Sequence, residues 1–235
     1  MKSRKVALIT GGSQGIGAGL VDGYRRLGYA VVANSRSIAA SDDHDLVTVA
    51  GDISDPAIAE AMVAAAIESF GRVDTLVNNA GIFLAKPFLD YTPEDFDTAI
   101  RINLGGFFHI TQNAVAQMSA QGSGHVVNVT TTLVENALTN VPSALASLTK
   151  GGTAAVTKSL AIEYASRGIR FNAVSPGIIQ TPLHAPETHA TYAALHPVGR
   201  MGTIDDIVRG VLYLEQAPFV TGEFLHVDGG QSAGN

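Results

Sequence analysis

The feature that most constrains this chain is a glycine-rich turn that joins an apolar run to a helical pattern. Residues 6–9 read as a buried strand, and residues 16–27 read as a helix. Gly11, Gly15 and Gly17 lie in or next to the turn between them. Glycine lets a backbone approach a pyrophosphate closely, and the free N–H groups at a helix start attract the phosphate charge. The turn predicts a dinucleotide site, with a purely structural turn as the alternative.

Strand-like and helix-like runs alternate along the rest of the chain. The expected strands are residues 6–9, 30–33, 46–50, 73–77, 125–129, 169–174 and 225–227, and the expected helices are residues 16–27, 56–70, 93–118 and 142–165. Such alternation implies right-handed crossovers and a parallel sheet. Hydrophobic residues make up 46% of the chain, which suits a sheet covered on both faces. We expect a single α/β domain, residues 1–235, with a Rossmann-type doubly wound parallel sheet of about seven strands and helices on both faces.

Polar clusters directly follow most of the expected strands. They are residues 10–17, residues 34–36, Asp52, residues 78–81, residues 130–132 and residues 175–177. The carboxyl ends of parallel strands meet at one edge of a sheet, which is where open α/β sheets bind ligands. The clusters therefore predict one shared site.

Composition excludes several classes of function. The net charge is −6 and no run of Lys or Arg is present, so we expect no nucleic-acid partner and no membrane partner. The chain has no cysteine, which removes disulfides and thiolate catalysis. The apolar run 6–9 is too short for a signal peptide, and no run approaches the ~20 residues of a membrane span, so we expect a cytoplasmic protein. A P-loop needs Lys followed by Ser or Thr after its last glycine, and here Ala18 and Gly19 stand in those places, so we do not expect phosphate transfer.

Three histidines, His184, His189 and His196, fall in a Pro-rich segment near the carboxyl terminus. Their spacing fits neither a pair on one helix face nor a short zinc hairpin, and no His-Glu-x-x-His motif accompanies them. We expect no metal site.

Taken in order, the polar clusters resemble the motifs of the short-chain dehydrogenase/reductase family over residues 6–230. The residues that carry the resemblance are Thr10, Gly11, Gly15, Gly17, Asp52, Asn78, Asn79, Ala80, Gly81, Asn103, Lys150, Pro176, Gly177, Thr181, Asp228, Gly229 and Gly230. The resemblance implies an oxidoreductase that binds a nicotinamide nucleotide and acts on a small-molecule carbonyl/alcohol substrate. It also implies a homotetramer or homodimer formed through the helices at 93–118 and 142–165, and a substrate lid at about residues 180–200.

The resemblance also assigns roles to single residues. It implies that Asp52 holds the adenine, that Thr181 meets the nicotinamide carboxamide and that Lys150 binds ribose hydroxyls. The expected cofactor contacts are Gly11, Ser13, Gln14, Gly15, Ile16, Gly17, Ser35, Arg36, Asp52, Ile53, Asn79, Ala80, Gly81, Lys150, Pro176, Gly177, Ile179 and Thr181. Two motif residues have structural alternatives, because Asp52 can cap the helix that begins near residue 56 and Asn78 can tie adjacent strands together.

The end of the second strand predicts which nicotinamide nucleotide binds. An acidic side chain there would accept hydrogen bonds from the ribose 2′-hydroxyl and repel a 2′-phosphate. Ser35 and Arg36 stand there instead, and a hydroxyl beside a guanidinium suits a phosphate. We expect NADP(H) to be preferred over NAD(H). A solvent-exposed arginine without a ligand is the alternative.

The resemblance breaks at the catalytic helix. Members of the family carry a tyrosine four residues before the lysine, and the ammonium lowers the pKa of the phenol that exchanges a proton with the substrate oxygen. Here Ala146 stands four residues before Lys150. The remaining catalytic candidates are Asn103, Thr131 and Lys150, with Thr132 as an alternative to Thr131 for the hydroxyl that binds the substrate carbonyl. Strand propensity is the alternative reason for these threonines.

Loss of the phenol predicts a slow proton transfer, because a positioned general acid contributes roughly 10² to 10⁴ in rate. Candidate replacements are a water relayed through Asn103 and Lys150, or one of Ser143, Ser147, His184 and Tyr192. The sequence predicts an NADP(H)-dependent oxidoreductase with a non-standard or weakened proton-transfer step. The alternative is a non-catalytic NADP(H)-binding protein that acts as a sensor or assembly partner.

Overall fold

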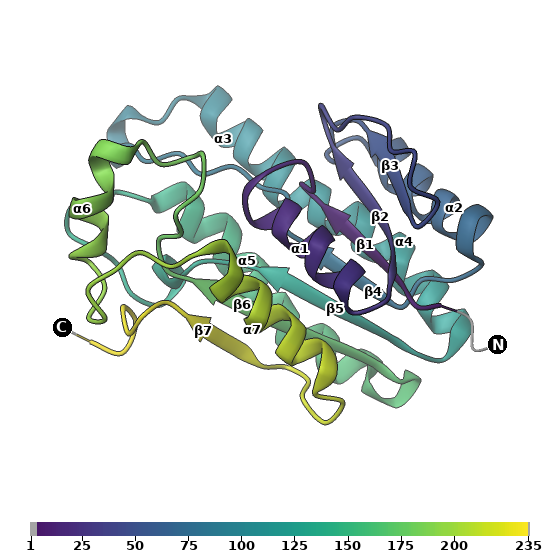
Figure 1. The fold of residues 1–235 in the computed structure, drawn as a ribbon. Coiled ribbons are helices and arrows are strands. Elements are labelled where there is room, and N and C mark those ends of the chain that lie inside the picture. The colour runs from purple at the N-terminus through teal and green to yellow at the C-terminus, as the bar shows by residue number, and fades with distance from the viewer. Residues whose placement is uncertain (1–3, 235) are drawn as a thin grey trace.

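The protein is built on a parallel β-sheet, seen in a computed structural model that describes residues 4–234 (Figure 1). Its strands are β1 (Val6–Thr10), β2 (Ala30–Ser35), β3 (Leu46–Ala50), β4 (Thr75–Asn78), β5 (Gly124–Val129), β6 (Ile169–Pro176) and β7 (Phe224–Val227). They lie in the order β3-β2-β1-β4-β5-β6-β7, and every neighbouring pair is parallel. The predicted α/β fold with seven parallel strands is confirmed.

Helices cover both faces of the sheet (Figure 1). They are α1 (Gly15–Arg26), α2 (Pro56–Phe70), α3 (Pro93–Ala99), α4 (Gly106–Gln121), α5 (Ala144–Tyr164), α6 (His189–Ala193) and α7 (Ile204–Gln216), with a π-helix at Ile100–Gly105 and 3₁₀ turns at Phe88–Asp90, Thr132–Val134, Ala165–Arg167 and Pro186–Thr188. Apolar side chains of α2, α4 and α5 pack on one face, and those of α1 and α7 pack on the other.

The interior strand β1 shows how the two layers form. Val6 and Leu8 belong to the core under α2 and α4, whereas Ala7 and Ile9 belong to the core under α1 and α7. All four are fully buried, because successive residues of a strand face opposite sides of the sheet. Burying an aliphatic side chain contributes about 1.5–3 kcal/mol, so these two layers hold the fold. The loops at the strand ends take little part in these cores, so they can carry polar groups.

Two predicted helices differ from those observed. The helix expected at residues 93–118 is α3 and α4 with the π-helix Ile100–Gly105 between them, and α4 runs on to Gln121. Gly122 ends it in the left-handed conformation, with φ +73°. The helix expected at 142–165 begins two residues later, at Ala144. The three helical segments follow one another without a break, which is why the pattern read as one continuous helix.

Helix α7 was not predicted, although the sequence carries its signals. Thr203 accepts a hydrogen bond from the backbone N–H of Asp206, and the Asp206 carboxylate accepts one from the backbone N–H of Thr203. This capping box precedes buried Ile207, Val208 and Val211 at helical spacing. None of the helices within residues 4–234 combines the length and the apolar character that a membrane span requires.

Candidate functional site

Two adjoining cavities lie at the carboxyl ends of the strands. We call the first the glycine-turn cavity; it has a volume of about 380 Å³ and lies between the β1–α1 turn, the end of β2 and the loop after β4. The predicted cofactor residues in its wall are Gly11, Ser13, Gln14, Gly15, Ile16, Gly17, Ser35, Arg36, Asp52, Ile53, Asn79, Ala80, Gly81 and Thr181. The polar clusters that follow separate strands are therefore brought together in space.

The second cavity, which we call the Lys150 cavity, has a volume of about 570 Å³. Its wall includes the other predicted cofactor residues, Lys150, Pro176, Gly177 and Ile179, together with Thr131 and Ala146. The two cavities share Gln14, Ile16, Arg36, Asn79, Gly81, Ile82, Thr181 and Leu183 in their walls. They therefore form one continuous hollow at this edge of the sheet.

The β1–α1 turn has the geometry of an anion site. Gly11 and Gly15 have φ of +68° and +56°, which favours glycine. A Cβ at Gly17 would lie 1.9 Å from the carbonyl oxygen of Gly11, so this glycine is needed for packing. A Cβ at Gly15 would meet the Thr181 side chain at 3.6 Å, an ordinary van der Waals distance, so Gly15 is needed for its left-handed backbone rather than for space. Gln14, the N-cap of α1, makes no side-chain cap hydrogen bond, which leaves the first-turn N–H groups without a side-chain acceptor.

Asn79 fixes this turn against β4. Its side-chain Nδ2 donates to the carbonyl oxygens of Thr10 at 2.9 Å and Gly11 at 3.3 Å. The Thr10 hydroxyl accepts from the backbone N–H groups of Asn79 and Ala80, both at 3.0 Å. The floor of the cavity is thus rigid before any ligand binds.

The end of β2 presents a hydroxyl and a cation. The Oγ of Ser35 is inaccessible to solvent and has no hydrogen-bond partner among residues 4–234. Arg36 is exposed at the mouth of both cavities. Neighbouring Asn34 is structural, because its Nδ2 donates to the carbonyls of Val49 and Gly51 and so ties β2 to β3.

Asp52 does not cap α2, so that alternative is wrong. Asp55 is the N-cap and accepts from the backbone N–H of Ala57 at 2.9 Å. Asp52 accepts from the backbone N–H of Ser54 at 3.0 Å, which lowers the pKa of the Asp52 carboxyl, and the Arg101 guanidinium lies 3.5 Å away. The carboxylate stays in the wall of the glycine-turn cavity.

Asn78 has the structural role that the sequence left open. Its Nδ2 donates to Asn128 Oδ1 and Thr111 Oγ1, both at 2.9 Å, and so links β4 to β5 and α4. Asn128 in turn donates to Thr157 of α5 at 2.8 Å. This buried chain of hydrogen bonds holds the strand ends under the site in register.

Asn103 lies in the π-helix and is buried. Its Oδ1 accepts from the backbone N–H of Ile82 at 2.8 Å, and its Nδ2 donates to the Ile82 carbonyl and to Thr149 Oγ1, both at 3.0 Å. It lines a separate small cavity of about 10 Å³ that Lys150 also lines. Such a volume is about the least that holds a water molecule. Asn103 therefore lies beside the Lys150 cavity rather than in its wall.

Lys150 is held at the junction of these spaces. Its Nζ donates to the carbonyl oxygen of Val129 at 2.8 Å. Burial lowers the pKa of the Lys150 ammonium to about 8. A Cβ at Gly81 would lie 3.1 Å from both Lys150 Nζ and Asn103 Oδ1, so a side chain there would crowd both groups.

The threonines after β5 are now distinguished. Thr132 is buried and donates its hydroxyl proton to Gln231 Oε1 at 2.8 Å, while the hydroxyl of Thr130 donates to the Val174 carbonyl. Thr131 Oγ1 accepts from the backbone N–H of Leu133 at 3.3 Å, and no acceptor for its proton is found within residues 4–234. Thr131 is thus the hydroxyl that can donate into the Lys150 cavity.

Ala146 lies on α5, one turn before Lys150, and its methyl group forms part of the cavity wall. It is buried and has no proton to exchange. On the same helix, the Ser147 hydroxyl donates to the Leu133 carbonyl at 3.0 Å, and Ser143 is not part of the cavity wall.

The histidine-rich segment divides by role. His184 and Tyr192 lie in the wall of the Lys150 cavity. His196 is buried, and its Nε2 accepts from the backbone N–H of Ile178 while Nδ1 lies 2.8 Å from the Tyr192 carbonyl, so it supports the loop after β6. His189 Nε2 lies 3.2 Å from the His184 carbonyl.

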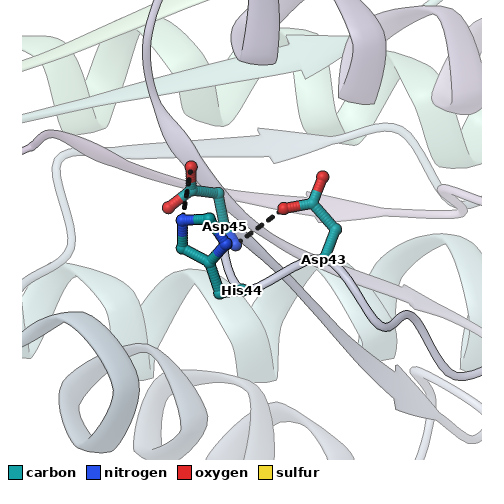
Figure 2. Close-up of side chains that lie close together, drawn as sticks. All are labelled: Asp43, His44 and Asp45. Atoms are coloured by element: carbon teal, nitrogen blue, oxygen red, sulfur yellow. Dashed lines mark hydrogen bonds and ion pairs between the residues drawn. The ribbon is translucent and has the colours of Figure 1, made fainter.

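Among residues 4–234, Asp43, His44 and Asp45 form the one group spaced closely enough to hold a metal ion (Figure 2). Asp43 forms an ion pair with Arg25 at 2.6 Å, and Asp45 forms one with Arg4. Both carboxylates lie on the β2–β3 loop and are already paired with arginines from outside that loop, and none of the three residues lines either cavity.

Gln231 is a wall residue that sequence reasoning missed. It is buried in the Lys150 cavity wall, its Oε1 accepts from Thr132, and its Nε2 has no partner within the described residues. A single glutamine after Gly230 gives no pattern by which to find it. Its position depends on the carboxyl-terminal segment folding back toward β5.

A sequence model of the family described as enoyl-(acyl carrier protein) reductase matches residues 11–232. The chain is 36% identical to cis-4-hydroxycyclohexanecarboxylate dehydrogenase of Sinomonas cyclohexanicum, over 98% of each chain. It resembles the structure of 3-ketoacyl-(acyl-carrier-protein) reductase from Brucella melitensis complexed with NADH (TM-score 0.89, 34% identity, covering 97% and 98% of the two chains). It also resembles ElxO with NADP bound (TM-score 0.91, 29% identity, 98% and 100%). The chain belongs to the short-chain dehydrogenase/reductase family of oxidoreductases.

Proposed function

We propose that this protein is an NADP(H)-dependent oxidoreductase that acts on a carbonyl/alcohol pair and has a weakened proton-transfer step. The observation that carries the proposal is the continuity of the two cavities: one is lined by the predicted nucleotide contacts, and the other is walled by Lys150, Thr131 and Ala146. We further propose that Ala146 occupies the position of the family's catalytic tyrosine, one turn before Lys150.

The residues present fit a nicotinamide nucleotide. The α1 N-terminus lacks a side-chain cap, the Gly15 backbone has the left-handed conformation that favours glycine, and the Ser35 hydroxyl is buried without a partner within residues 4–234. A pyrophosphate at the uncapped N–H groups and a phosphate at Ser35 would satisfy these groups. When bound, the nicotinamide supplies the hydride that is exchanged with the substrate carbon.

The preference for NADP(H) rests on charge at the end of β2. Ser35 and Arg36 stand there without a carboxylate, and a guanidinium binds a 2′-phosphate in a planar, multidentate manner. Both nucleotides occur among the related structures, with NADP bound to ElxO and NADH bound to the Brucella reductase. Relatives therefore leave the choice open, and the proposal depends on this chain's own residues.

The remaining residues divide the work of orienting the reactants. Thr131 donates its hydroxyl proton to the substrate oxygen and so polarises the carbonyl. Lys150 holds ribose hydroxyls from its place against the Val129 carbonyl. Asn103 fixes the loop at Ile82 to α5 and keeps Lys150 in position. None of these groups replaces the acidity of a phenol beside an ammonium, which is why the proton step is weakened.

A single-turnover experiment tests the proposal. NADPH bound to the protein is mixed with a panel of aldehydes and ketones, and its absorbance is followed. We expect oxidation of NADPH with at least one carbonyl class. Tight NADPH binding without turnover for any substrate would favour the second candidate function, a non-catalytic NADP(H)-binding sensor or assembly partner, which the methyl group of Ala146 in the cavity wall supports.

The proposal includes a cytoplasmic homotetramer or homodimer. Phe108 of α4 and Leu148 and Ile162 of α5 are 57%, 55% and 81% exposed, and a second copy would cover them. Sedimentation velocity of the purified protein tests the assembly.

A further inference from the structure

The loss of the phenol raises the question of which group exchanges the substrate proton. Among the described residues, the wall of the Lys150 cavity carries four ionisable side chains, Arg36, Lys150, His184 and Tyr192. Arg36 is excluded, since a guanidinium does not release its proton in proteins. Ser147 is already engaged with the Leu133 carbonyl, and the small alcohols of serine and threonine are weak acids.

His184 is held in place but has an unused ring nitrogen. Its backbone N–H donates to the Thr181 carbonyl at 3.0 Å, its carbonyl lies 3.2 Å from His189 Nε2, and its ring meets the Tyr192 ring edge to face at 5.3 Å between centroids. The ring also interacts with the backbone of Ile179. Its Nδ1 is inaccessible to solvent and has no partner within residues 4–234. A buried nitrogen of this kind is stabilised only when a ligand supplies the hydrogen bond.

The position of His184 connects it to both reactants. Thr181, whose carbonyl accepts from the His184 backbone N–H, is the predicted contact of the nicotinamide carboxamide, and Ile179, which interacts with the His184 ring, is another predicted cofactor contact. The same side chain shares the cavity wall with Thr131 and Ala146. Lys150, by contrast, is held by the Val129 carbonyl and is needed at the ribose.

We propose that His184 is the proton donor and acceptor of this site and exchanges a ring proton with the substrate oxygen, a role that rests on the proposed oxidoreductase function. In reduction, the carbonyl carbon gains a hydride from the nicotinamide and the carbonyl oxygen gains the proton from the imidazole. The imidazole then regains a proton from water. In oxidation, the neutral imidazole accepts the hydroxyl proton while the hydride returns to the oxidised nicotinamide.

The charged surroundings of His184 set the sign of the pH dependence. His189 and Tyr192 lie beside it on its own segment, and Lys150 and Arg36 face the same cavity from α5 and β2. Burial lowers the pKa of His184 below its ordinary value; a hydrogen bond with the Ile179 backbone opposes this shift, and the charge of His189 adds to it. Reduction therefore slows as pH rises through this pKa, and oxidation speeds up. A profile centred near 8 would instead identify Lys150 as the donor.

The test compares His184→Gln with His44→Gln, a control whose side chain is 89% exposed on a distant loop. We expect His184→Gln to lower the single-turnover rate by about 10² or more, to remove the pH dependence below pH 7 and to leave the NADPH dissociation constant within about twofold. The control should match the wild type. NMR titration of the free protein, a readout independent of activity, should give His184 a midpoint below about 6.5.

Several outcomes would overturn the role of His184. The first is a single-turnover rate in His184→Gln equal to that of the wild type, and the second is a pH–rate profile that keeps its midpoint in that variant. The third is an NMR titration in which His184 shows the ordinary pKa of a histidine, and the fourth is a larger loss of rate in Tyr192→Phe than in His184→Gln. If the wild type binds NADPH but no carbonyl substrate of the panel leads to its oxidation, the proposed function itself fails. A wild type that is active and a His184→Gln variant of equal activity would refute the histidine alone.

Discussion

The two edges of the sheet treat polar groups in opposite ways. At the amino edge, Glu215 at the end of α7 has a side chain only 6% exposed. Its carboxylate accepts from the hydroxyls of Tyr24 at 3.2 Å, Tyr29 at 2.7 Å and Thr75 at 3.0 Å, and lies 2.8 Å from His125 Nδ1. Burial alone would raise the pKa of Glu215, but the hydrogen bonds from His125, Tyr29 and Thr75 outweigh it and hold the pKa at about 2.

At the carboxyl edge, buried groups remain without partners. Ser35 Oγ, His184 Nδ1 and Gln231 Nε2 each lie in a cavity wall, and Asn78 Oδ1 and Ser175 Oγ lie at the ends of β4 and β6; all five are unpaired within residues 4–234. Helix α1 begins there without a side-chain cap, as do α4, α5 and α6, whereas α2, α3 and α7 are capped by Asp55, Thr92 and Thr203. A satisfied network adds stability, while unsatisfied groups cost stability until a ligand binds. The amino edge serves the fold and the carboxyl edge serves binding.

The largest effect should come from adding a proton donor at the carboxyl edge of the sheet. In Ala146→Tyr, the ammonium of Lys150 one turn away would lower the pKa of the new phenol. We expect the single-turnover rate with carbonyl substrates to rise by about 10² to 10⁴. In this background His184→Gln should cost little, since the phenol bypasses the imidazole. An unchanged rate in a folded Ala146→Tyr protein would show that proton transfer does not limit the wild type.

The next largest effect tests the amino edge of the sheet, where Glu215 is buried. Glu215→Gln keeps the shape but removes the charge that four groups share, and we expect it to lower the free energy of unfolding by about 3 kcal/mol at pH 7. Because folding lowers the pKa of both Glu215 and His125, their stabilisation is complete above pH 6.5 and is lost as pH falls toward 2. Urea unfolding at pH 7 and pH 4 should show a smaller pH difference in the variant. An equal difference would mean that other carboxylates set the acid limit.

Reversing the charge of Arg36, at the carboxyl edge, should change which nicotinamide nucleotide binds, with little change in the free energy of unfolding. Arg36→Asp removes the cation beside a 2′-phosphate and adds a repelling carboxylate, so we expect NADPH affinity to fall about tenfold or more while NADH affinity holds. Arg209→Asp, on the exposed side of α7, is the matched control. Fluorescence titration with both nucleotides measures the ratio. Equal losses for both would mean that Arg36 is only a surface charge.

The smallest effect sharpens the comparison at a single atom. Ser35→Ala deletes a buried hydroxyl that has no partner within the described residues, so the free protein should be as stable as the wild type or gain up to about 1 kcal/mol. Thr75→Val at the amino edge deletes a hydroxyl bonded to Glu215 and should lose about that amount. Thermal melts with and without NADPH measure both. A stability loss in Ser35→Ala would place this hydroxyl in the fold rather than the site.

The sequence predicted the sheet well because local patterns set it. Near-continuous apolar strands, the glycine turn and the polar clusters after each strand are short-range features, and topology follows from the alternation of strands and helices. Helix α7 was missed although its capping box at Thr203 and Asp206 is also local. The π-helix that carries Asn103 was not predicted, and the partners that Asn103 binds there, Ile82 and Thr149, lie far from it in the sequence.

The sequence by itself determined the fold class, the edge at which polar residues gather and the absence of a tyrosine before Lys150. Only the tertiary structure decided which hydroxyl after β5 is free, because Thr132 is engaged by Gln231 from 99 residues away and Thr131 is not. It also decided that Asp55 rather than Asp52 caps α2, and that His184 keeps an unpaired nitrogen in the cavity wall while His196 is fully bonded. Hydrogen-bond partners that are far apart in the chain meet only once the chain has folded. Residue types and spacing therefore cannot show which polar groups stay without a partner.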